Sequence, residues 1–151
     1  MRITERGVGL IRRYEGLRLT AYLDAVGVPT IGYGHTKTAR MGQTIAADQA
    51  ETLLRADLRQ FEAGAALLLK RPVKPSQFDA LVSFAFNVGL DIDADSKAEG
   101  LGDSTLLALV NAGCDQDAAA EFLKWNRAGG RALLGLTRRR LTEAQLYLED
   151  L

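Results

Sequence analysis

The chain has 151 residues, of which 47% are hydrophobic and 25% are charged. This balance is typical of a globular domain that buries a core of its own. The 19 basic and 19 acidic side chains cancel, whereas a nucleic-acid-binding domain usually has a clear basic excess. The longest apolar run, "AGAALLLK", is too short to cross a bilayer. We therefore expect a monomer that binds no nucleic acid and does not insert into a membrane.

The distribution of charge and the cysteine content restrict the possible partners and the possible covalent cross-links of the protein. Residues 1–45 contain seven Arg or Lys against three Asp or Glu, whereas residues 46–103 contain six against ten. The positive N-terminal part favours a polyanionic surface as partner. A single cysteine, Cys114, excludes an intrachain disulfide. Charges occur throughout the first sixteen residues, "MRITERGVGLIRRYEG", so no signal peptide is expected.

The N-terminal part of the chain predicts a helix followed by a small hairpin. Thr4 can act as the N-cap of the helix, whose apolar residues recur with helical spacing. Gly16 is a natural left-handed stop. Two short β segments follow, over residues 19–23 and 29–33, and "DAVG" is suited to a type I turn between them.

The rest of the chain predicts further helices. Thr44 can cap a long helix that stops near Lys70, because two prolines follow. Pro75 suits the first turn of a helix that is apolar on most faces and ends at Gly89. Three more helices are expected: one with Asp103 as its N-cap, one that begins at Asp115, and one over residues 136–151.

The expected fold is α+β and mostly helical, in a single domain over residues 1–151. A small β-containing lobe covers about residues 14–45, and a connecting helix covers about residues 45–70. A helical lobe over about residues 74–151 packs with the helix at residues 3–15. A groove between two such lobes is the default place for a ligand.

One long loop is expected, the acidic stretch "LDIDADSKAEGLGDS". Asp91, Asp93 and Asp95 suggest a calcium site. The EF-hand pattern, however, requires Gly at its sixth position and Glu at its twelfth. The chain has Ser96 and Gly102 there. We therefore expect a solvated acidic loop, with no metal and no cofactor.

Two carboxyl groups near the hairpin have contrasting surroundings. Glu15 falls in the last turn of the first helix, where the negative end of the helix dipole favours the protonated acid. A protonated carboxyl is what a general acid needs. Asp24 falls in a turn, where local hydrogen bonds and water favour the carboxylate. Such a contrast is typical of the paired carboxyls that cleave glycosides. The alternative is a solvent-facing helix-end Glu and a turn-forming Asp.

If residues 29–33 form a strand, Thr30, Gly32 and Gly34 share one face. A hydroxyl followed by two missing side chains would let a bulky ligand approach the backbone. The two glycines are equally compatible with turn formation alone. His35 would lie on the opposite face, where we expect it to make a structural hydrogen bond.

The stretch from Glu15 to His35 contains E-G-x-R-L-x-x-Y-x-D followed by P-T-I-G-Y-G-H. It resembles the signature of the phage-type lysozymes, the muramidase endolysins of bacteriophages and prophages. The likeness continues in "QFDALVSFAFNVG" from Gln77, in "STLL" from Ser104, and in Trp125 with "GLTRRRLTE" after it. The resemblance therefore covers nearly the whole chain, and it implies a two-lobed fold with the active-site cleft between a hairpin lobe and a helical lobe.

The resemblance also implies a reaction: hydrolysis of the β-1,4 bond between N-acetylmuramic acid and N-acetylglucosamine in peptidoglycan glycan strands. Matched by motif, Glu15 is the general acid. Asp24 and Thr30 hold the water or support the positive charge that develops at the anomeric carbon. Because Thr30 suits a water site, we expect the wide carboxyl separation of about 6.5–9.5 Å that accompanies inversion.

Further positions are suggested by the same resemblance. Core packing, helix capping or simple exposure explains each of them equally well. Trp125 is expected in the core, and one guanidinium of residues 138–140 is expected to point at the cleft or its acidic residues. The positions that match sugar-contacting or cleft-facing residues are Thr36, Phe86, Asn87 and Thr105.

Two other functions remain open at this point. A lytic transglycosylase would cleave the same bond with a single acidic residue, and a non-catalytic peptidoglycan-binding module would bind without cleavage. Because no export or anchoring segment is visible, we expect synthesis into the host cytoplasm. The protein would then act on the wall, causing lysis, after release through a separate permeabilising protein.

Overall fold

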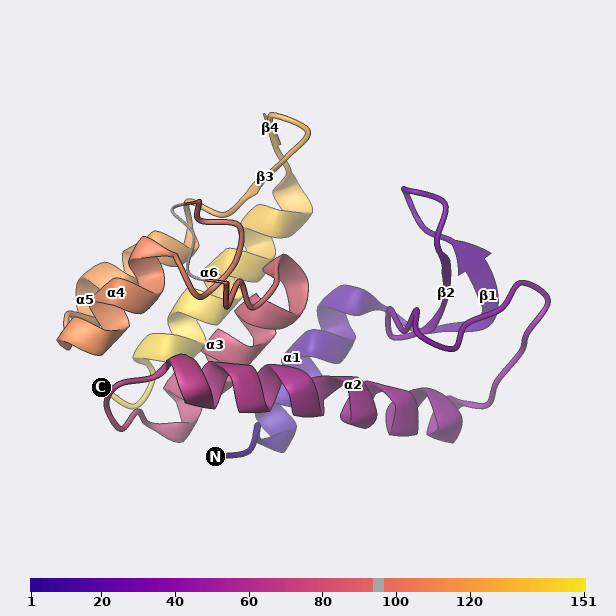
Figure 1. Cartoon of the computed structure of the whole chain (residues 1–151), viewed down its shortest axis with the longest axis horizontal. Coiled ribbons are helices and arrows are strands. Elements are labelled where there is room, and N and C mark those ends of the chain that lie inside the picture. The colour runs from indigo at the N-terminus through magenta and orange to yellow at the C-terminus, as the bar shows by residue number, and fades with distance from the viewer. Residues whose placement is uncertain (94–96) are drawn as a thin grey trace. The chain divides into compact units, whose positions relative to one another are not determined.

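The computed structural model describes residues 1–93 and 97–151 (Figure 1). Over these residues the chain is mostly helical, with short pairs of strands. It forms two compact units: the hairpin unit, Gly9–Gln60, and the helical unit, which combines Met1–Val8 with Phe61–Leu151. The predicted fold class is confirmed: the protein is α+β, with a small N-terminal hairpin and a helical remainder.

The hairpin unit contains most of α1 (Glu5–Glu15) and the antiparallel pair β1 (Arg18–Leu23) and β2 (Pro29–Gly32). Gly16 ends α1 in the left-handed region, at φ +71°, as the sequence predicts. Its N–H donates to the Arg12 carbonyl at 3.0 Å. The helix therefore leads directly into the first strand.

The chain reverses direction sooner than expected at the end of the second strand. Ile31 and His35 exchange two backbone hydrogen bonds, each 2.9 Å long. The turn between them contains Gly32 at φ +66° and Gly34 at φ +77°, a conformation that side chains disfavour. The prediction that Gly34 continues the strand face of Thr30 is therefore wrong, because the strand ends at Gly32.

The long helix also begins later than expected. The N–H of Ala21 in β1 donates to the carbonyl of Gln43 at 2.9 Å, and Thr44 forms an antiparallel bridge with Thr20. This backbone pairing holds Thr44 outside the helix, so the prediction that it caps the helix is wrong. The helix, α2 (Ala47–Leu68), ends close to the predicted stop.

A small hydrophobic cluster lies within the hairpin unit. Its buried residues are Ala21, Ile31, Ile45 and Ala50. Gly32 packs against it, since a Cβ at this position would lie 3.4 Å from the Ala50 Cβ. Gly32 is buried against α2, so the idea that it opens the sheet to a ligand is wrong for this glycine.

The helical unit is organised around a central helix, α3 (Pro75–Val88), which begins at the predicted proline and has the predicted Gly89 as its C-cap. α3 packs against α6 (Leu134–Leu148), and α5 (Asp115–Phe122) contacts both α6 and α4 (Thr105–Ala112). None of the helices in the described part of the chain has the length and hydropathy needed to cross a bilayer.

The N-terminal segment belongs to the helical unit. The N–H of Ile3 donates to Glu62 Oε1, and the N–H of Thr4 donates to Asp79 Oδ1, both at 2.8 Å. The Thr4 hydroxyl, expected as a helix cap, also donates to Asp79. These bonds fasten the start of α1 to helices that come much later in the chain.

The start of α4 differs by one residue from the prediction. Its N-cap is Ser104, whose Oγ accepts a hydrogen bond from the N–H of Leu107 at 3.0 Å. Asp103, the predicted cap, lies just outside. Asp and Ser are both good N-caps, so N-cap preference does not predict which of the two adjacent residues begins the helix.

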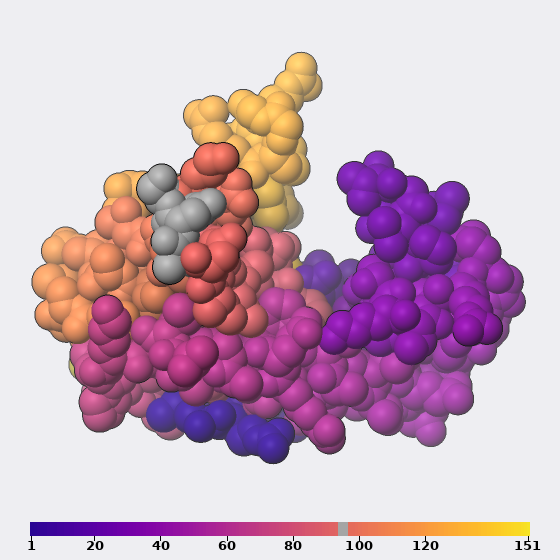
Figure 2. Space-filling model, viewed as in Figure 1, coloured from indigo at the N-terminus to yellow at the C-terminus, as the bar shows by residue number. Residues whose placement is uncertain are grey.

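A second hairpin precedes α6 and was not expected. β3 (Arg127–Ala128) and β4 (Arg131–Ala132) pair across a turn formed by Gly129 and Gly130, both with positive φ. A Gly-Gly pair is a known signal for such a turn. Figure 2 shows this hairpin standing out from the surface of the helical unit.

A buried cluster of charges joins α3 to α6. Glu143 is fully buried and accepts hydrogen bonds from Arg139 Nε at 3.2 Å and from Ser83 Oγ at 2.7 Å. It also pairs with Arg140, which is fully buried as well. One carboxylate thus serves two buried guanidinium groups.

A surface cluster joins α1 to α2 within the hairpin unit. Arg12 Nε donates to Glu51 Oε2, and Arg55 Nε donates to Glu51 Oε1, both at 2.8 Å. The hydrogen bond from Arg12 and the neighbouring Arg55 hold the pKa of Glu51 below its usual value. Arg12 lies one turn before the end of α1, so this cluster fixes the last turn of that helix.

We expect Glu143→Ala to lower the free energy of unfolding by about 3–5 kcal/mol, because two buried guanidiniums lose their carboxylate. Glu149→Ala is the control, since Glu149 pairs with Arg6 on the exposed surface; it should cost less than about 1 kcal/mol. Urea denaturation followed by circular dichroism measures both. Equal losses would contradict a structural role for the buried cluster.

We expect Glu51→Gln to change how stability depends on pH. Because the folded pKa of Glu51 lies below its usual 4.5, the unfolded chain binds more protons there in acid, and the stability contributed by Glu51 is lost as the pH falls through that range. The wild type should exceed the variant by under about 1 kcal/mol above pH 5. The difference should shrink as the pH falls through the lowered pKa. Urea midpoints at several pH values would show this, and a pH-independent difference would contradict it.

Candidate active site

Glu15 is the last residue of α1 and is partly buried. Its carboxyl faces the turn that follows β2. A Cβ built on Gly34 would lie 3.2 Å from Glu15 Oε2, and apart from the chain neighbours of Gly34 it would meet only this carboxyl within 4 Å. A side chain at position 34 would therefore press directly on the acid.

Asp24 builds the turn in which it lies. Its Oδ1 accepts hydrogen bonds from the N–H groups of Val26 at 3.0 Å and Val28 at 2.8 Å. Its own carbonyl accepts from the N–H of Gly27 at 3.0 Å. The predicted turn with Asp first and Gly fourth is confirmed, and two backbone N–H groups that follow Asp24 fix its carboxylate through Oδ1.

Thr30 lies on β2 and is 3% exposed. Its hydroxyl donates to the Val28 carbonyl at 2.9 Å. A hydroxyl has one hydrogen to donate and two lone pairs to accept with. With the hydrogen directed at the backbone, Oγ1 is oriented as an acceptor.

His35 is 5% exposed and makes structural hydrogen bonds, as expected. Its Nδ1 lies 2.7 Å from Asp57 Oδ2 on α2. Its Nε2 accepts from the N–H of Thr38 at 3.2 Å. Because Nε2 accepts, the network assigns the ring hydrogen to Nδ1, which donates to Asp57.

The structure places the motif residues in one unit. Glu15, Asp24 and Thr30 all belong to the hairpin unit, on α1, in the turn of the hairpin and on β2. Thr36 belongs there too and is exposed, directly after the turn that faces Glu15. Their roles in a reaction stay predictions.

The other suggested contacts lie in the helical unit. Phe86 is partly buried and packs edge-on against Phe61, with ring centroids 5.1 Å apart. The Asn87 Oδ1 accepts a hydrogen bond from Arg140. Thr105 is exposed at the start of α4. The structure gives Phe86 a packing role and Asn87 a hydrogen-bonding role, while a role in sugar binding stays a prediction for all three.

Trp125, expected in the core, is only partly buried, at the edge of an aromatic cluster. It lies edge-on to Phe84, with centroids 5.3 Å apart, and its carbonyl accepts from Arg140 Nε at 3.0 Å. Of the three consecutive arginines, Arg139 and Arg140 belong to the buried cluster with the α6 carboxylate. Arg138 is the exposed member of the run.

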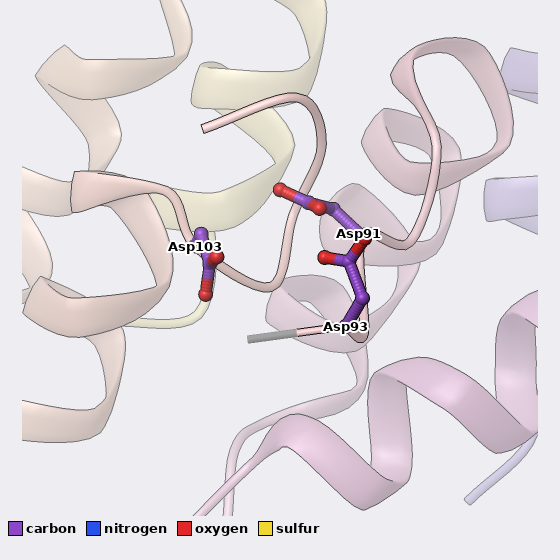
Figure 3. Close-up of side chains that lie close together, drawn as sticks. All are labelled: Asp91, Asp93 and Asp103. Atoms are coloured by element: carbon purple, nitrogen blue, oxygen red, sulfur yellow. The ribbon is translucent and has the colours of Figure 1, made fainter. Parts of the chain in front are cut away.

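The acidic loop brings three carboxylates together, those of Asp91, Asp93 and Asp103 (Figure 3), with ligand oxygens within 4.8 Å of one another. Asp95, part of the calcium pattern weighed from the sequence, lies outside the described residues. Asp91 already accepts a hydrogen bond from the N–H of Glu99 at 2.9 Å. One carboxylate of the group therefore helps to hold the loop.

Sequence reasoning missed the contribution of Gly34 to the surroundings of Glu15. The P-T-I-G-Y-G-H stretch does not indicate that its two glycines have different surroundings. It does allow a turn, because glycines on either side of one residue are compatible with a tight reversal as well as with a strand. The contact with Glu15 itself joins segments that the local pattern cannot relate.

Comparison with known proteins agrees with the fold and with the motif. Residues 12–143 match the family model for phage lysozyme. The endolysin of Bacillus phage B103 is 47% identical over 98% of this chain and 54% of the relative. The solved endolysin from Escherichia coli O157:H7 phage FAHEc1 superposes with a TM-score of 0.87 and 36% identity, covering 100% of this chain and 96% of that chain.

The muramidase domain of SpmX from Asticaccaulis excentricus also superposes with a TM-score of 0.87, at 38% identity, covering 97% of each chain. The chain thus spans about half the length of the Bacillus phage relative and nearly all of both solved structures. The resemblance found in the sequence is confirmed, and the chain belongs to the phage lysozyme family.

Proposed function

We propose that the protein is an endolysin of the lysozyme type, a glycoside hydrolase that cleaves the β-1,4 bond between N-acetylmuramic acid and N-acetylglucosamine in peptidoglycan. Membership of the phage lysozyme family supports this class of reaction. The observation that carries the proposal is the surroundings of Glu15. Its carboxyl ends a helix and lies beside Gly34, which has no side chain to cover it, and this supports its access to a substrate oxygen.

Glu15 acts as the general acid. It transfers its proton to the glycosidic oxygen while the bond from that oxygen to the anomeric carbon breaks, and this requires an approach of about 2.6–3.2 Å. Positive charge develops at the anomeric carbon. The Asp24 carboxylate, fixed in the hairpin turn through Oδ1, uses its other oxygen to stabilise that charge or to take a proton from the attacking water.

Thr30 holds the water. Because its hydrogen is directed at the Val28 carbonyl, Oγ1 accepts a hydrogen bond from the water and leaves a water lone pair for attack. A water placed between carboxylate and sugar favours inversion at the anomeric carbon. The hydroxyl orientation within the hairpin unit supports this role.

The substrate is the glycan strand of the bacterial wall, and the protein acts as a monomer. We further propose that it is made in the host cytoplasm and reaches the wall through a separate permeabilising protein. Lysis of the host cell then follows from loss of glycan integrity.

We expect Glu15→Gln to keep the fold and peptidoglycan binding while lysis of permeabilised Gram-negative cells falls by about 10²–10⁴-fold, because the amide cannot donate the required proton. The measurement is the loss of turbidity, together with sedimentation of the protein with cell walls. Glu149→Gln, the same change at an exposed residue of the helical unit that pairs with Arg6, should remain lytic. Persistent lysis by Glu15→Gln would remove this residue from the mechanism.

The products of the parent protein decide between reaction types. Hydrolysis leaves a free reducing end, whereas a lytic transglycosylase leaves a 1,6-anhydro ring. Mass spectrometry of the released muropeptides should show reducing ends. Anhydro products would contradict hydrolysis, and wall binding without any product would indicate a non-catalytic binding module.

We expect Thr30→Val to reduce lysis on the order of 10–100-fold, because the water loses its acceptor and its position. The lost bond to Val28 should lower the free energy of unfolding by only about 1 kcal/mol. Thr20→Val, the same change at an exposed position of β1, should leave lysis unchanged. Full activity of Thr30→Val would show that Thr30 is only a strand residue.

A further inference from the structure

We propose that Gly34 is a positioning residue of the reaction: the absence of a side chain at this position keeps the Glu15 carboxyl in place and open to the glycosidic oxygen. This inference rests on the proposed function. It assigns a catalytic consequence to a residue that carries no reactive group.

The geometry singles out this glycine. A Cβ at Gly34 would lie 3.2 Å from Glu15 Oε2 and 4.0 Å from Glu15 Cδ. At Gly32, which has a similar φ, the Cβ would instead meet the Ala50 side chain and backbone at 3.4 and 3.5 Å. At Gly42 it would meet nothing within 4 Å. Gly34 thus combines a positive φ with a contact to the acid.

The surrounding backbone cannot easily yield to a new side chain. Ile31 and His35 close the turn with two backbone hydrogen bonds. The ring of His35 is in turn fixed to Asp57 on α2. A methyl group at position 34 would therefore displace the flexible end of Glu15. Displacement by less than an ångström is enough to impair a proton transfer that depends on alignment.

The positive φ of Gly34 alone would explain why glycine occupies this position. The experiment must therefore distinguish backbone strain from the contact between a new Cβ and Glu15. Gly42 offers the matched control. It has φ +88° in a turn where the N–H of Gln43 donates to the Arg40 carbonyl at 3.0 Å. Alanine at position 42 experiences the same kind of backbone strain as alanine at position 34, without touching Glu15.

The experiment compares Gly34→Ala with Gly42→Ala in the full chain. Thermal unfolding should show a fall in Tm of about 2–4 °C for each. Turnover of purified peptidoglycan should show kcat reduced on the order of 10–100-fold in Gly34→Ala. Its KM, and the kcat and KM of Gly42→Ala, should stay within about twofold of the wild type, a spread that corresponds to under half a kcal/mol.

A second variant covers the case in which Gly34→Ala does not fold. Asparagine tolerates positive φ better than alanine but still carries a Cβ, so Gly34→Asn should regain stability and remain impaired in kcat. Equal kcat for Gly34→Asn and Gly42→Ala would overturn the inference while leaving the proposed function intact. An inactive wild type would overturn the proposed function itself.

Discussion

The buried hydrogen bond between His35 and Asp57 is the constraint on which the hairpin unit depends. It fastens the turn after β2 to α2, and this turn faces the end of α1 through Gly34. Arg12 and Glu51 fasten the last turn of α1 to the same helix. α2 therefore supports both the end of α1 that carries Glu15 and the turn that faces it, and neither segment depends on the small hydrophobic cluster alone.

The carboxylates of Glu143 and Asp24 have different kinds of hydrogen-bond donor around them. Glu143 in the helical unit is enclosed by guanidinium and hydroxyl donors, which suits a carboxylate that only has to stay charged and stationary. Asp24 in the hairpin unit receives its hydrogen bonds from backbone amides on one oxygen. A carboxylate held in this way is fixed in position by the backbone of its own turn, which suits the role in stabilising positive charge that we propose for it.

The sequence predicted those parts of the fold that depend on neighbouring residues. The stop at Gly16, the turn at Asp24 and the start of α3 at Pro75 follow from short-range rules about glycine, aspartate and proline. Thr44 was misassigned because its backbone pairs with a strand distant in sequence. The reversal at Gly32 was missed because a strand and a tight turn accept the same residues.

The candidate site was reached in a different way. A contrast between Glu15 and Asp24 was expected from helix and turn chemistry, but their assignment as a catalytic pair came from the resemblance to a family and stays a prediction. The buried Arg139 bonds to Glu143 on its own helix and to the Ser83 carbonyl on α3, and the buried Arg140 pairs with the same carboxylate. Side-chain environments of this kind require the packing of whole helices, which no local pattern contains.

The division of the chain into units has a consequence for the order of assembly. The hairpin unit is one continuous segment, Gly9–Gln60, whereas the helical unit joins the first eight residues to the last part of the chain. Ile3 bonds to Glu62, and Arg6 pairs with Glu149 near the C-terminus. During synthesis, every partner within the hairpin unit is available early, while the N-terminal residues must await the final helix before the helical unit can close.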